Sequence, residues 1–600
     1  MERTIPRGGD AAFRDLNKNG RLDPYEDPRR PIEERIEDLL AQMTLEEKAG
    51  MLFQTMVLLD EENGPAFGAP AAEMITGRLM NHFNVFGGAA ARRMAEWHNR
   101  LQTLAEDTRL GIPLTLSSDP RHAFTDNPMT SMWAGSFSLW PEPIGLAAIG
   151  DPALVKTFAD IARREYLAVG IRLALHPMAD LATEPRWGRS NGTFGEDASL
   201  AAPLVAAYIR GFQGETLGPE SVACMTKHFP GGGPQKDGED PHFPYGREQI
   251  YPGDNFAYHL PPFEAALAAG AAQIMPYYGM PIGLQYEEVG FGFNKDVITG
   301  LLRGKYGFEG VVCTDWGLLT DAMLARHVLP ARAWGVEHLS LAERVRKALD
   351  AGVDQFGGEA CPEVIVDLVT GGHVPESRVD ASVRRLLRDK FRLGLFDNPY
   401  VDPEAAERVV GNEEFRAAGA VAQRQSLVLL KNGDTPGGAT LPVRGRPKIY
   451  IENIAAEVAG AYGQVVPTVH EADVAILRLL APYEPREGFL ESLIHAGDLS
   501  FPEGELARIL HILAAVPTVV DIYLDRPAVI PEIAAQSAAL LANFGADDAA
   551  VLDLIFGRCS PAGKLPFELP SSMEAVRRQK PDVPHDSDNP LFPFGHGLIY

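Results

Sequence analysis

The chain alternates short apolar segments with longer amphipathic ones over residues 31–395. The apolar segments, such as 171–181 and 222–229, are rich in residues that favour strands, whereas 153–169 and 198–212 have the apolar spacing of helices. This alternation predicts parallel strands, because a parallel pair needs a long crossover connection that is usually a helix. Roughly six or seven such units in about 360 residues predict an α/β domain built as a (β/α)8 barrel or a variant of one.

A second pattern of the same kind begins near residue 425. Segments such as 448–452 and 474–480 alternate with helical ones, and the glycine-rich phosphate-binding motifs are missing. This predicts a second domain over 425–600, an α/β/α sandwich with a mostly parallel sheet. Residues 396–424 are polar and predict a linker that ends in a helix, and residues 1–30 form an N-terminal arm.

Charge and cysteine content limit the expected partners. The 600 residues carry a formal net charge of −26, and such an acidic chain repels nucleic acid and anionic membranes, so neither is an expected partner. Four cysteines without a CxxC pair form no disulfide framework. The sequence has no apolar run of about 18 residues and no leader-like N-terminus, which predicts a cytoplasmic protein. We expect a small-molecule substrate, and the sequence leaves the oligomeric state open.

Polar side chains follow the predicted barrel strands at the point where each strand ends. The carboxyl ends of all strands in a barrel open on one face, where barrels build their substrate sites. These side chains are therefore expected to meet at the barrel mouth. They are Asp119, Asp180, Lys227, His228, Tyr277 and Asp315.

Seven motifs, spread in order over nearly the whole chain, carry a family resemblance. They are MTLEEKAGML (43–52), EPRWGRSNGTFGED (184–197), KHFPGGG (227–233), GVVCTDWG (310–317), QSLVLLKN (425–432), GRCSPAGKLPFELP (557–570) and LFPFGHGLIY (591–600). Together they resemble glycoside hydrolase family 3. The resemblance implies a two-domain, exo-acting, retaining β-glycosidase, most simply a β-glucosidase. Catalysis in such an enzyme needs no cofactor.

The resemblance also implies roles for residues at matching positions. Asp315 would be the nucleophile, one of two carboxylates that a retaining glycosidase holds about 5–5.5 Å apart. Sugar hydroxyls are donors and acceptors at once, so a sugar site combines carboxylates with cationic side chains. The implied substrate-binding residues are Asp119, Arg189, Lys227, His228, Tyr277 and Trp316.

The acid/base is expected on a long loop of the second domain that covers the barrel mouth. The PYE step in this loop favours Glu484, with Glu487 and Glu491 as alternatives. A competing placement is a His–Asp pair on a barrel loop, Asp240 with His242, which resembles the β-N-acetylhexosaminidase branch of the family. That branch, a phosphorylase and an inactive carbohydrate-binding protein stay open as alternative functions.

The N-terminal arm carries a separate motif. DLNKNGRLDPYE (15–26) matches the spacing of a calcium-binding loop, with Gly20 at its sharp turn. A structural calcium ion is one interpretation, and a turn held only by its own Asp and Asn side chains is the other. The oxygen ligands would come from Asp15, Asn17, Asn19, Arg21, Asp23 and Glu26.

Overall fold

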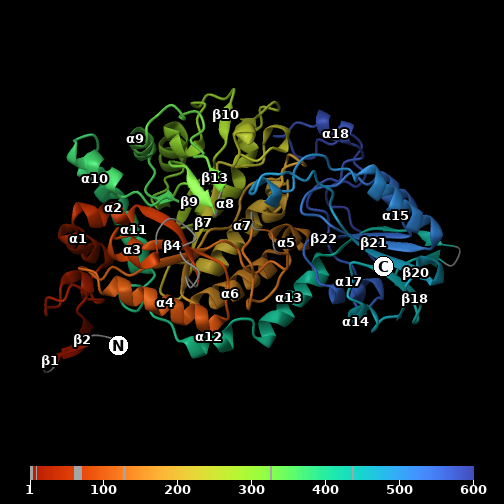
Figure 1. Cartoon of the computed structure of the whole chain (residues 1–600), viewed down its shortest axis with the longest axis horizontal. Coiled ribbons are helices and arrows are strands. Elements are labelled where there is room, and N and C mark those ends of the chain that lie inside the picture. The colour runs from red at the N-terminus through yellow and green to blue at the C-terminus, as the bar shows by residue number, and fades with distance from the viewer. Residues whose placement is uncertain are drawn as a thin grey trace.

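The computed structural model describes residues 4–7, 10–59, 70–125, 127, 130–324, 327–435 and 438–600. Two α/β units make up the molecule, joined by a pair of helices that runs along the lower edge of Figure 1. The first unit is the larger, and the second lies at the right of the figure.

The first unit is a closed barrel of eight parallel strands, as predicted. The sheet is closed between its outer strands by a bridge from Cys313 to Gln355 and by the Thr314 N–H, which donates to the Gln355 carbonyl at 2.9 Å. In order round the barrel the strands are β11 (Val311–Val312), β9 (Gln273–Pro276), β7 (Ala223–Phe229), β6 (Ile171–Ala174), β5 (Thr115–Ser118), β4 (His82–Phe86), β3 (Phe53–Leu58) and β14 (Phe356–Gly357).

Helices follow the strands and cover the outside of the barrel. Their apolar faces pack against strands that are buried on both sides. The helices are α3 (Ala71–Thr76), α4 (Ala91–Glu106), α5 (Pro143–Ile149), α6 (Pro152–Ala168), α7 (Ala198–Gln213), α8 (Pro261–Ala268), the π-helix η8 (Asp296–Lys305), α9 (Leu341–Ala351), α10 (Glu363–Thr370) and α11 (Glu376–Arg392).

Two short helices lead into the first strand of the barrel. They are α1 (Ile32–Gln42) and α2 (Leu45–Met51), and Phe53 begins β3. The break lies at Thr44, whose extended backbone and side chain cap the second helix by accepting the Glu47 N–H at 3.3 Å. Thr44 and Glu47 form a capping box, which marks the start of a helix.

Two helices and a six-stranded sheet follow the barrel along the chain. Helices α12 (Pro403–Val409) and α13 (Glu413–Ser426) occupy the linker, and the sheet order is β15-β22-β21-β20-β18-β19, with only β15 antiparallel to its neighbour. The strands are β15 (Val428–Asn432), β18 (Lys448–Glu452), β19 (Gln464–Val465), β20 (Val474–Leu480), β21 (Thr518–Tyr523) and β22 (Ala539–Asn543). The helices are α14 (Ala456–Ala459), α15 (Glu503–Ala515), α16 (Pro531–Gln536), α17 (Asp548–Ile555) and α18 (Met573–Arg578).

Shorter elements decorate both units. Strand β8 pairs in parallel with β10, and the remaining ribbons are antiparallel hairpins. They are β1 (Thr4–Arg7) with β2 (Asp10–Arg14), β8 (Glu248–Ile250) with β10 (Met280–Ile282), β12 (Ala322–Leu324) with β13 (His327–Leu329), and β16 (Asp434–Thr435) with β17 (Gly438–Ala439).

The second domain packs on the barrel beside its mouth. The Tyr523 hydroxyl donates to the Glu142 carboxylate at 2.7 Å, and the buried Arg526 guanidinium donates to the Arg186 carbonyl at 3.0 Å. A Cβ added at Gly188 would lie 2.3 Å from the His495 carbonyl oxygen, so only glycine permits this approach. These contacts hold the loop after β20 against the barrel.

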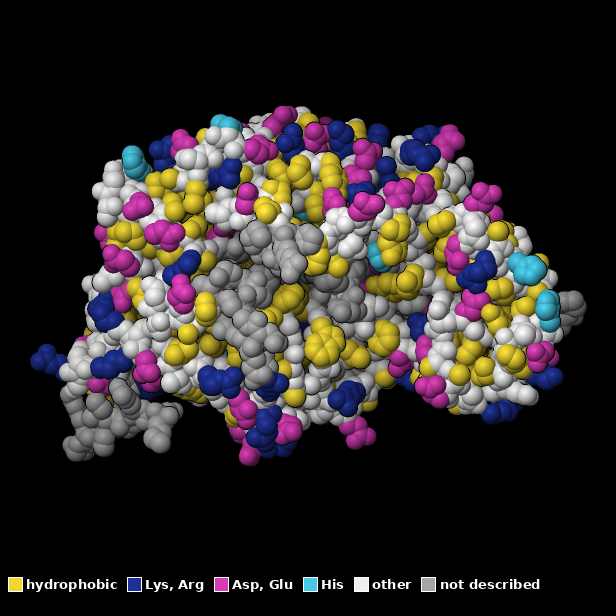
Figure 2. Space-filling model, viewed as in Figure 1, with side chains coloured by type: hydrophobic (Ala, Val, Ile, Leu, Met, Phe, Trp, Pro, Cys, Tyr) yellow, Lys and Arg dark blue, Asp and Glu magenta, His cyan; other side chains and the backbone are white. Residues whose placement is uncertain are grey.

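The surface carries both acidic and basic side chains. Acidic and basic side chains lie interspersed over the face seen in Figure 2. Within the part of the chain that the structure describes, none of the helices combines the length and the apolar character that a membrane span requires.

Candidate active site

The carboxyl ends of the barrel strands bring the predicted residues to one face. Asp119 directly follows β5, Lys227 and His228 lie in the last part of β7, and Tyr277 directly follows β9. Asp315 comes three residues after the last residue of β11. The strand-end prediction thus yields a single cluster at the barrel mouth, because parallel strands of one barrel all end on the same side.

Asp119 and Lys227 form a close ion pair. The Lys227 Nζ donates to the Asp119 Oδ1 at 2.9 Å, and the Asn84 amide donates to Oδ2 at 3.3 Å. Burial works to raise the pKa of Asp119, but the Lys227 ammonium outweighs it and holds that pKa below its ordinary value. Asp119 therefore stays ionised, and its partly exposed carboxylate can accept hydrogen bonds from a hydroxyl group.

His228 is fixed between two aspartates. Its Nδ1 lies 2.8 Å from the Asp180 Oδ2, and its Nε2 lies 3.7 Å from the Asp315 Oδ2. Burial and the nearby Arg189 lower the pKa of His228 far below its ordinary value, so the ring is neutral. The Nδ1–H of the neutral ring donates a hydrogen bond to the Asp180 carboxylate. Nε2 therefore carries no proton and can accept a hydrogen bond on the side of the site.

Asp180 was recognised only as a strand-end residue, and the structure gives it a positioning role. Besides His228 it accepts the backbone N–H of Gly232 at 2.6 Å, and its side chain is completely buried. Burial raises its pKa to about 6 against the lowering effect of Arg189 and these hydrogen bonds. A Cβ at Gly232 would lie 3.0 Å from the Asp180 Oδ1 and from the Tyr277 ring, which explains a glycine at this position.

Asp315 has one oxygen fixed and one free of protein partners. Oδ1 accepts the backbone N–H of Trp316 at 2.8 Å. Oδ2 is buried and has no hydrogen-bond partner among the described residues. The Tyr278 hydroxyl donates to the Trp316 carbonyl next to it. The unpaired oxygen of this carboxylate can therefore interact with a ligand.

Further unpaired polar atoms lie buried at the mouth. Among the described residues, Nε and Nη1 of Arg189, the Tyr277 hydroxyl and the Trp316 Nε1 have no hydrogen-bond partner. The Tyr277 ring lies 5.1 Å from the His228 ring, and the Trp316 ring packs on the backbone of Gly357 and Gly358. Buried polar atoms are nearly always paired in proteins, so this group indicates a place where a polar ligand binds.

The competing His–Asp pair also lies at this mouth. The His242 Nδ1 lies 2.5 Å from the Asp240 Oδ1, and its ring lies 4.8 Å from the Tyr278 ring, edge to face. Burial would raise the pKa of Asp240, but the His242 contact and the Arg189 charge lower it to about 2. The structure therefore brings this pair to the cluster.

The loop after β20 reaches the barrel from the second domain. The Arg486 guanidinium makes two hydrogen bonds of 2.7 Å to the Glu239 carboxylate, and the Tyr245 hydroxyl donates to the Glu491 Oε1 at 2.8 Å. We call residues 481–502 the lid, because they span the gap between the two domains beside Asp240. Both lid contacts reach the barrel loop that carries the His–Asp pair.

The three candidate glutamates of the lid lie in different surroundings. Glu484 is exposed, and its carboxylate lies against Gly497 near the buried Arg526 of the second domain. Glu487 is exposed, whereas Glu491 is half-buried at the start of η10 (Glu491–Leu493) and contacts the barrel through Tyr245. Glu491 is thus the candidate with a hydrogen bond to the barrel.

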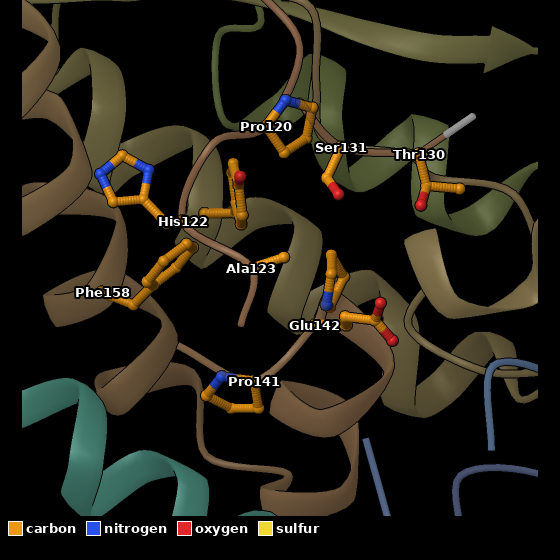
Figure 3. A pocket seen from close by; sticks show the side chains of 10 residues that line it. Pro120, His122, Ala123, Thr130, Ser131, Pro141, Glu142 and Phe158 are labelled. Atoms are coloured by element: carbon orange, nitrogen blue, oxygen red, sulfur yellow. The ribbon is translucent and has the colours of Figure 1, made fainter. Parts of the chain in front are cut away.

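A closed cavity near the mouth is too small to be the substrate site. Its volume is about 20 Å³, room for a single water molecule. In Figure 3, Glu142 and Thr130 lie on one side of it and His122 and Phe158 on the other. The unpaired atoms of Arg189, Tyr277 and Asp315 do not line this cavity.

The calcium-type loop of the N-terminal arm uses its oxygens on itself. The Glu26 carboxylate accepts the backbone N–H of Leu16 at 2.6 Å, and Asp15 accepts that of Gly20 at 2.9 Å. Among the described residues, no group of three or more His, Cys, Asp or Glu side chains is arranged to hold a metal ion. The structural calcium ion stays a prediction.

Comparison with known proteins gives matches over the whole chain. The model of the glycosyl hydrolase family 3 N terminal domain matches residues 44–388, and that of the family's C-terminal domain matches residues 419–600. A probable beta-glucosidase C from Aspergillus flavus is 54% identical, and the match covers 99% of this chain and 94% of that protein. A periplasmic beta-glucosidase/beta-xylosidase from Dickeya chrysanthemi is 44% identical, with 98% and 93% covered.

The solved structures agree with the fold. A β-glucosidase from Erythrobacter marinus has a TM-score of 0.79 at 22% identity, and the match covers 96% of this chain and 84% of that one. At this level of identity the likeness establishes the two-domain fold alone.

Proposed function

Because the chain belongs to glycosyl hydrolase family 3 and is a glycoside hydrolase, we propose that it is a retaining, exo-acting β-glucosidase that removes terminal β-D-glucosyl residues. The observation that carries the proposal is the unpaired Oδ2 of Asp315 at the barrel mouth, surrounded by buried polar atoms without partners. The beta-glucosidase relative, 54% identical along the chain, supports glucose as the sugar.

The proposed reaction has two steps. In the first, the Asp315 Oδ2 attacks the anomeric carbon while the acid/base gives its proton to the departing oxygen, so that one C–O bond forms and the other breaks. In the second, the same acid/base takes a proton from water, the water oxygen attacks the anomeric carbon, and the bond to Asp315 breaks. Two inversions return the β configuration.

The proposed binding site orients the sugar from several sides. Asp119 and Lys227 would hold the hydroxyls farthest from the scissile bond, while Arg189 and His228 would hold those nearer the anomeric carbon. Tyr277 lies beside His228, and Trp316 offers a ring face next to the nucleophile. Hydrogen bonds to the 2-hydroxyl strengthen in the transition state, so these contacts contribute to rate as well as to affinity.

We propose that the lid supplies the acid/base. The sequence favours Glu484, and the contact with Tyr245 favours Glu491. Replacement by alanine separates the two, because azide can take the place of the water that the missing base no longer activates, and it then restores turnover. Azide should rescue one of the three variants Glu484→Ala, Glu487→Ala and Glu491→Ala, and the other two should keep near-normal activity and show no rescue.

A panel of 4-nitrophenyl glycosides tests the proposed function. We expect β-glucoside to be cleaved best, β-xyloside more slowly, and the α-glucoside and β-N-acetylglucosaminide not measurably. The first product should be β-glucose by NMR, which shows retention. A 2-fluoro-glucoside should label Asp315 and no other residue. Cleavage of the N-acetyl substrate alone, or a first product of α configuration, contradicts the proposal.

A further inference from the structure

The Asp240–His242 pair is held in place by a tight turn of the barrel loop after β7. The pair lies between η4 (Lys236–Gly238) and η5 (Pro244–Gly246). A Cβ at Gly246 would lie 2.1 Å from the Asp240 carbonyl oxygen, so this glycine lets the chain close over Asp240. The Trp334 Nε1 donates to the Pro241 carbonyl at 2.8 Å and fixes the middle of the pair.

All protein contacts of the Asp240 carboxylate go to one oxygen. Oδ1 lies 2.5 Å from the His242 Nδ1 and accepts the His242 backbone N–H at 2.9 Å. Oδ2 is buried and has no hydrogen-bond partner among the described residues, although the whole residue is only 2% exposed. His242 thus orients the carboxylate and leaves its second oxygen available.

The unpaired oxygen belongs to a carboxylate whose charge acts on a buried cation that also has unpaired atoms. Asp240 is the anion with the strongest effect on the Arg189 guanidinium, yet the two residues, both described, form no direct ion pair. Arg189 is 3% exposed with two nitrogens unpaired, and the hydroxyl of Tyr277, which is completely buried, is unpaired as well. A hydroxyl group placed between Arg189 and Asp240 would accept from one and donate to the other.

We propose that Asp240, oriented by His242, is a sugar-binding residue whose Oδ2 accepts a hydrogen bond from one ring hydroxyl of the glycone, which in turn accepts from Arg189. This inference rests on the proposed glycosidase function and adds to it a residue that determines sugar specificity. Its unpaired Oδ2 gives the site a second acidic contact, separate from the Asp119–Lys227 pair.

Single-hydroxyl deletions in the substrate test the contact directly. With 4-nitrophenyl β-glucosides lacking the 2-, 3-, 4- or 6-hydroxyl, we expect Asp240→Asn to lower kcat/KM on the complete glucoside about 10- to 100-fold, as for a lost hydrogen bond to a charged group. On the one deoxy substrate that lacks the bound hydroxyl, wild type and variant should be equal within about threefold. On the other deoxy substrates the variant should keep its full deficit.

Two further variants keep the test decisive. Asp237→Asn is the matched control, since Asp237 lies in the same loop, is exposed and carries the same charge. It should leave every substrate unaffected. His242→Asn should reproduce the pattern of Asp240→Asn more weakly, because the carboxylate keeps its charge but loses its orientation. If thermal denaturation shows that Asp240→Asn does not fold, His242→Asn replaces it in the test.

Two results overturn the inference. An equal deficit on all four deoxy substrates shows that Asp240 only supports the loop. A deficit of His242→Asn that grows as the leaving group becomes more basic, from nitrophenyl to alkyl glucosides, shows that the pair acts as the acid/base. If the wild type did not cleave β-glucosides, the proposed function would be wrong. The proposal for Asp240 could still be tested, because wild type and Asp240→Asn can be compared on deoxy forms of the glycoside that the enzyme does cleave.

Discussion

The two ends of the barrel treat buried charge in opposite ways. At the base, where the strands begin, the completely buried Asp354 carboxylate forms ion pairs with Arg303 at 2.6 Å and with Arg385 at 2.9 Å. The buried Lys390 ammonium donates to two backbone carbonyls and to the Thr115 hydroxyl at 2.8–3.0 Å. At the mouth, Arg189 and Asp315 are also buried, yet each keeps polar atoms without a protein partner.

The difference separates stability from function within one fold. An unpaired buried charged group destabilises the folded chain, so a cluster of such groups at one face indicates a place where something binds. The base satisfies its charges within the protein and ties strands and helices together. At the mouth, charged side chains keep unpaired atoms that can form hydrogen bonds with hydroxyl groups. Substitutions at the mouth should therefore change kinetics more than stability, and those at the base the reverse.

The largest effect is expected from Asp315→Asn at the mouth. The amide cannot form the glycosyl-enzyme, so kcat should fall about 10⁴-fold or more, as for other lost nucleophiles. The melting temperature should stay equal or rise, because a buried carboxylate with an unpaired oxygen is removed. Turnover of 4-nitrophenyl β-glucoside and calorimetry measure the two quantities, with Asp107→Asn, exposed at the base, as control. A melting temperature lowered by many degrees would contradict the assignment of the mouth to function.

Asp354→Asn at the base should do the opposite. The change leaves Arg303, Arg378 and Arg385 facing each other without their shared carboxylate. Breaking a buried pair from one side destabilises by about 3–5 kcal/mol, and urea denaturation measures that free energy of unfolding. At 25 °C, kcat/KM should stay within about twofold of wild type. A large loss of activity with normal stability would show that the base is coupled to the chemistry.

The sequence predicted the mouth better than the lid. Asp119, Lys227, Tyr277 and Asp315 were placed correctly together, because strand topology alone decides where strand ends meet. The roles suggested for them and for Trp316, and the choice of acid/base, stay predictions. The lid depends on contacts such as Arg486 with Glu239, which lie 247 residues apart and arise only when the domains dock.

Glu142 at the domain interface is an intermediate case that sharpens the comparison. Its Oε1 accepts from Thr125, Tyr523 and Asn191, while Oε2 is unpaired and the residue lines the small cavity of Figure 3. Burial raises the pKa of this carboxyl to about 7, and the nearby Asp525 adds to the effect. The folded state thus favours the neutral form, and the stability that this provides is lost as pH rises from about 4.5 to 7.

We therefore expect Glu142→Gln to flatten the dependence of stability on pH. At pH 4 the two proteins should have similar free energies of unfolding. At pH 8 the variant should be more stable by roughly 3–4 kcal/mol, since each pKa unit between 4.5 and about 7 corresponds to about 1.4 kcal/mol. Urea denaturation at both values measures this, and Glu142→Ala, which also loses the hydrogen bonds to Tyr523 and Asn191, is the contrasting variant. A variant less stable than wild type at pH 8 would show that Glu142 is ionised and satisfied there.

The smallest effect should come from calcium at the N-terminal arm, which packs at the closed end of the barrel. Arg14 pairs with Glu106 at 2.7 Å there, and the loop's carboxylates already accept its own backbone N–H groups. Binding must replace those hydrogen bonds, so 10 mM calcium over a chelator should stabilise by only about 1 kcal/mol. Asp15→Asn should abolish this shift in melting temperature, because its amide can still accept the Gly20 N–H but carries no charge for the ion. Magnesium at the same concentration is the control. If calcium raised the melting temperature by many degrees, the oxygens of the arm would be available to a ligand, unlike the charged groups elsewhere at the base. The contrast between mouth and base would then hold for individual residues and not for the whole base.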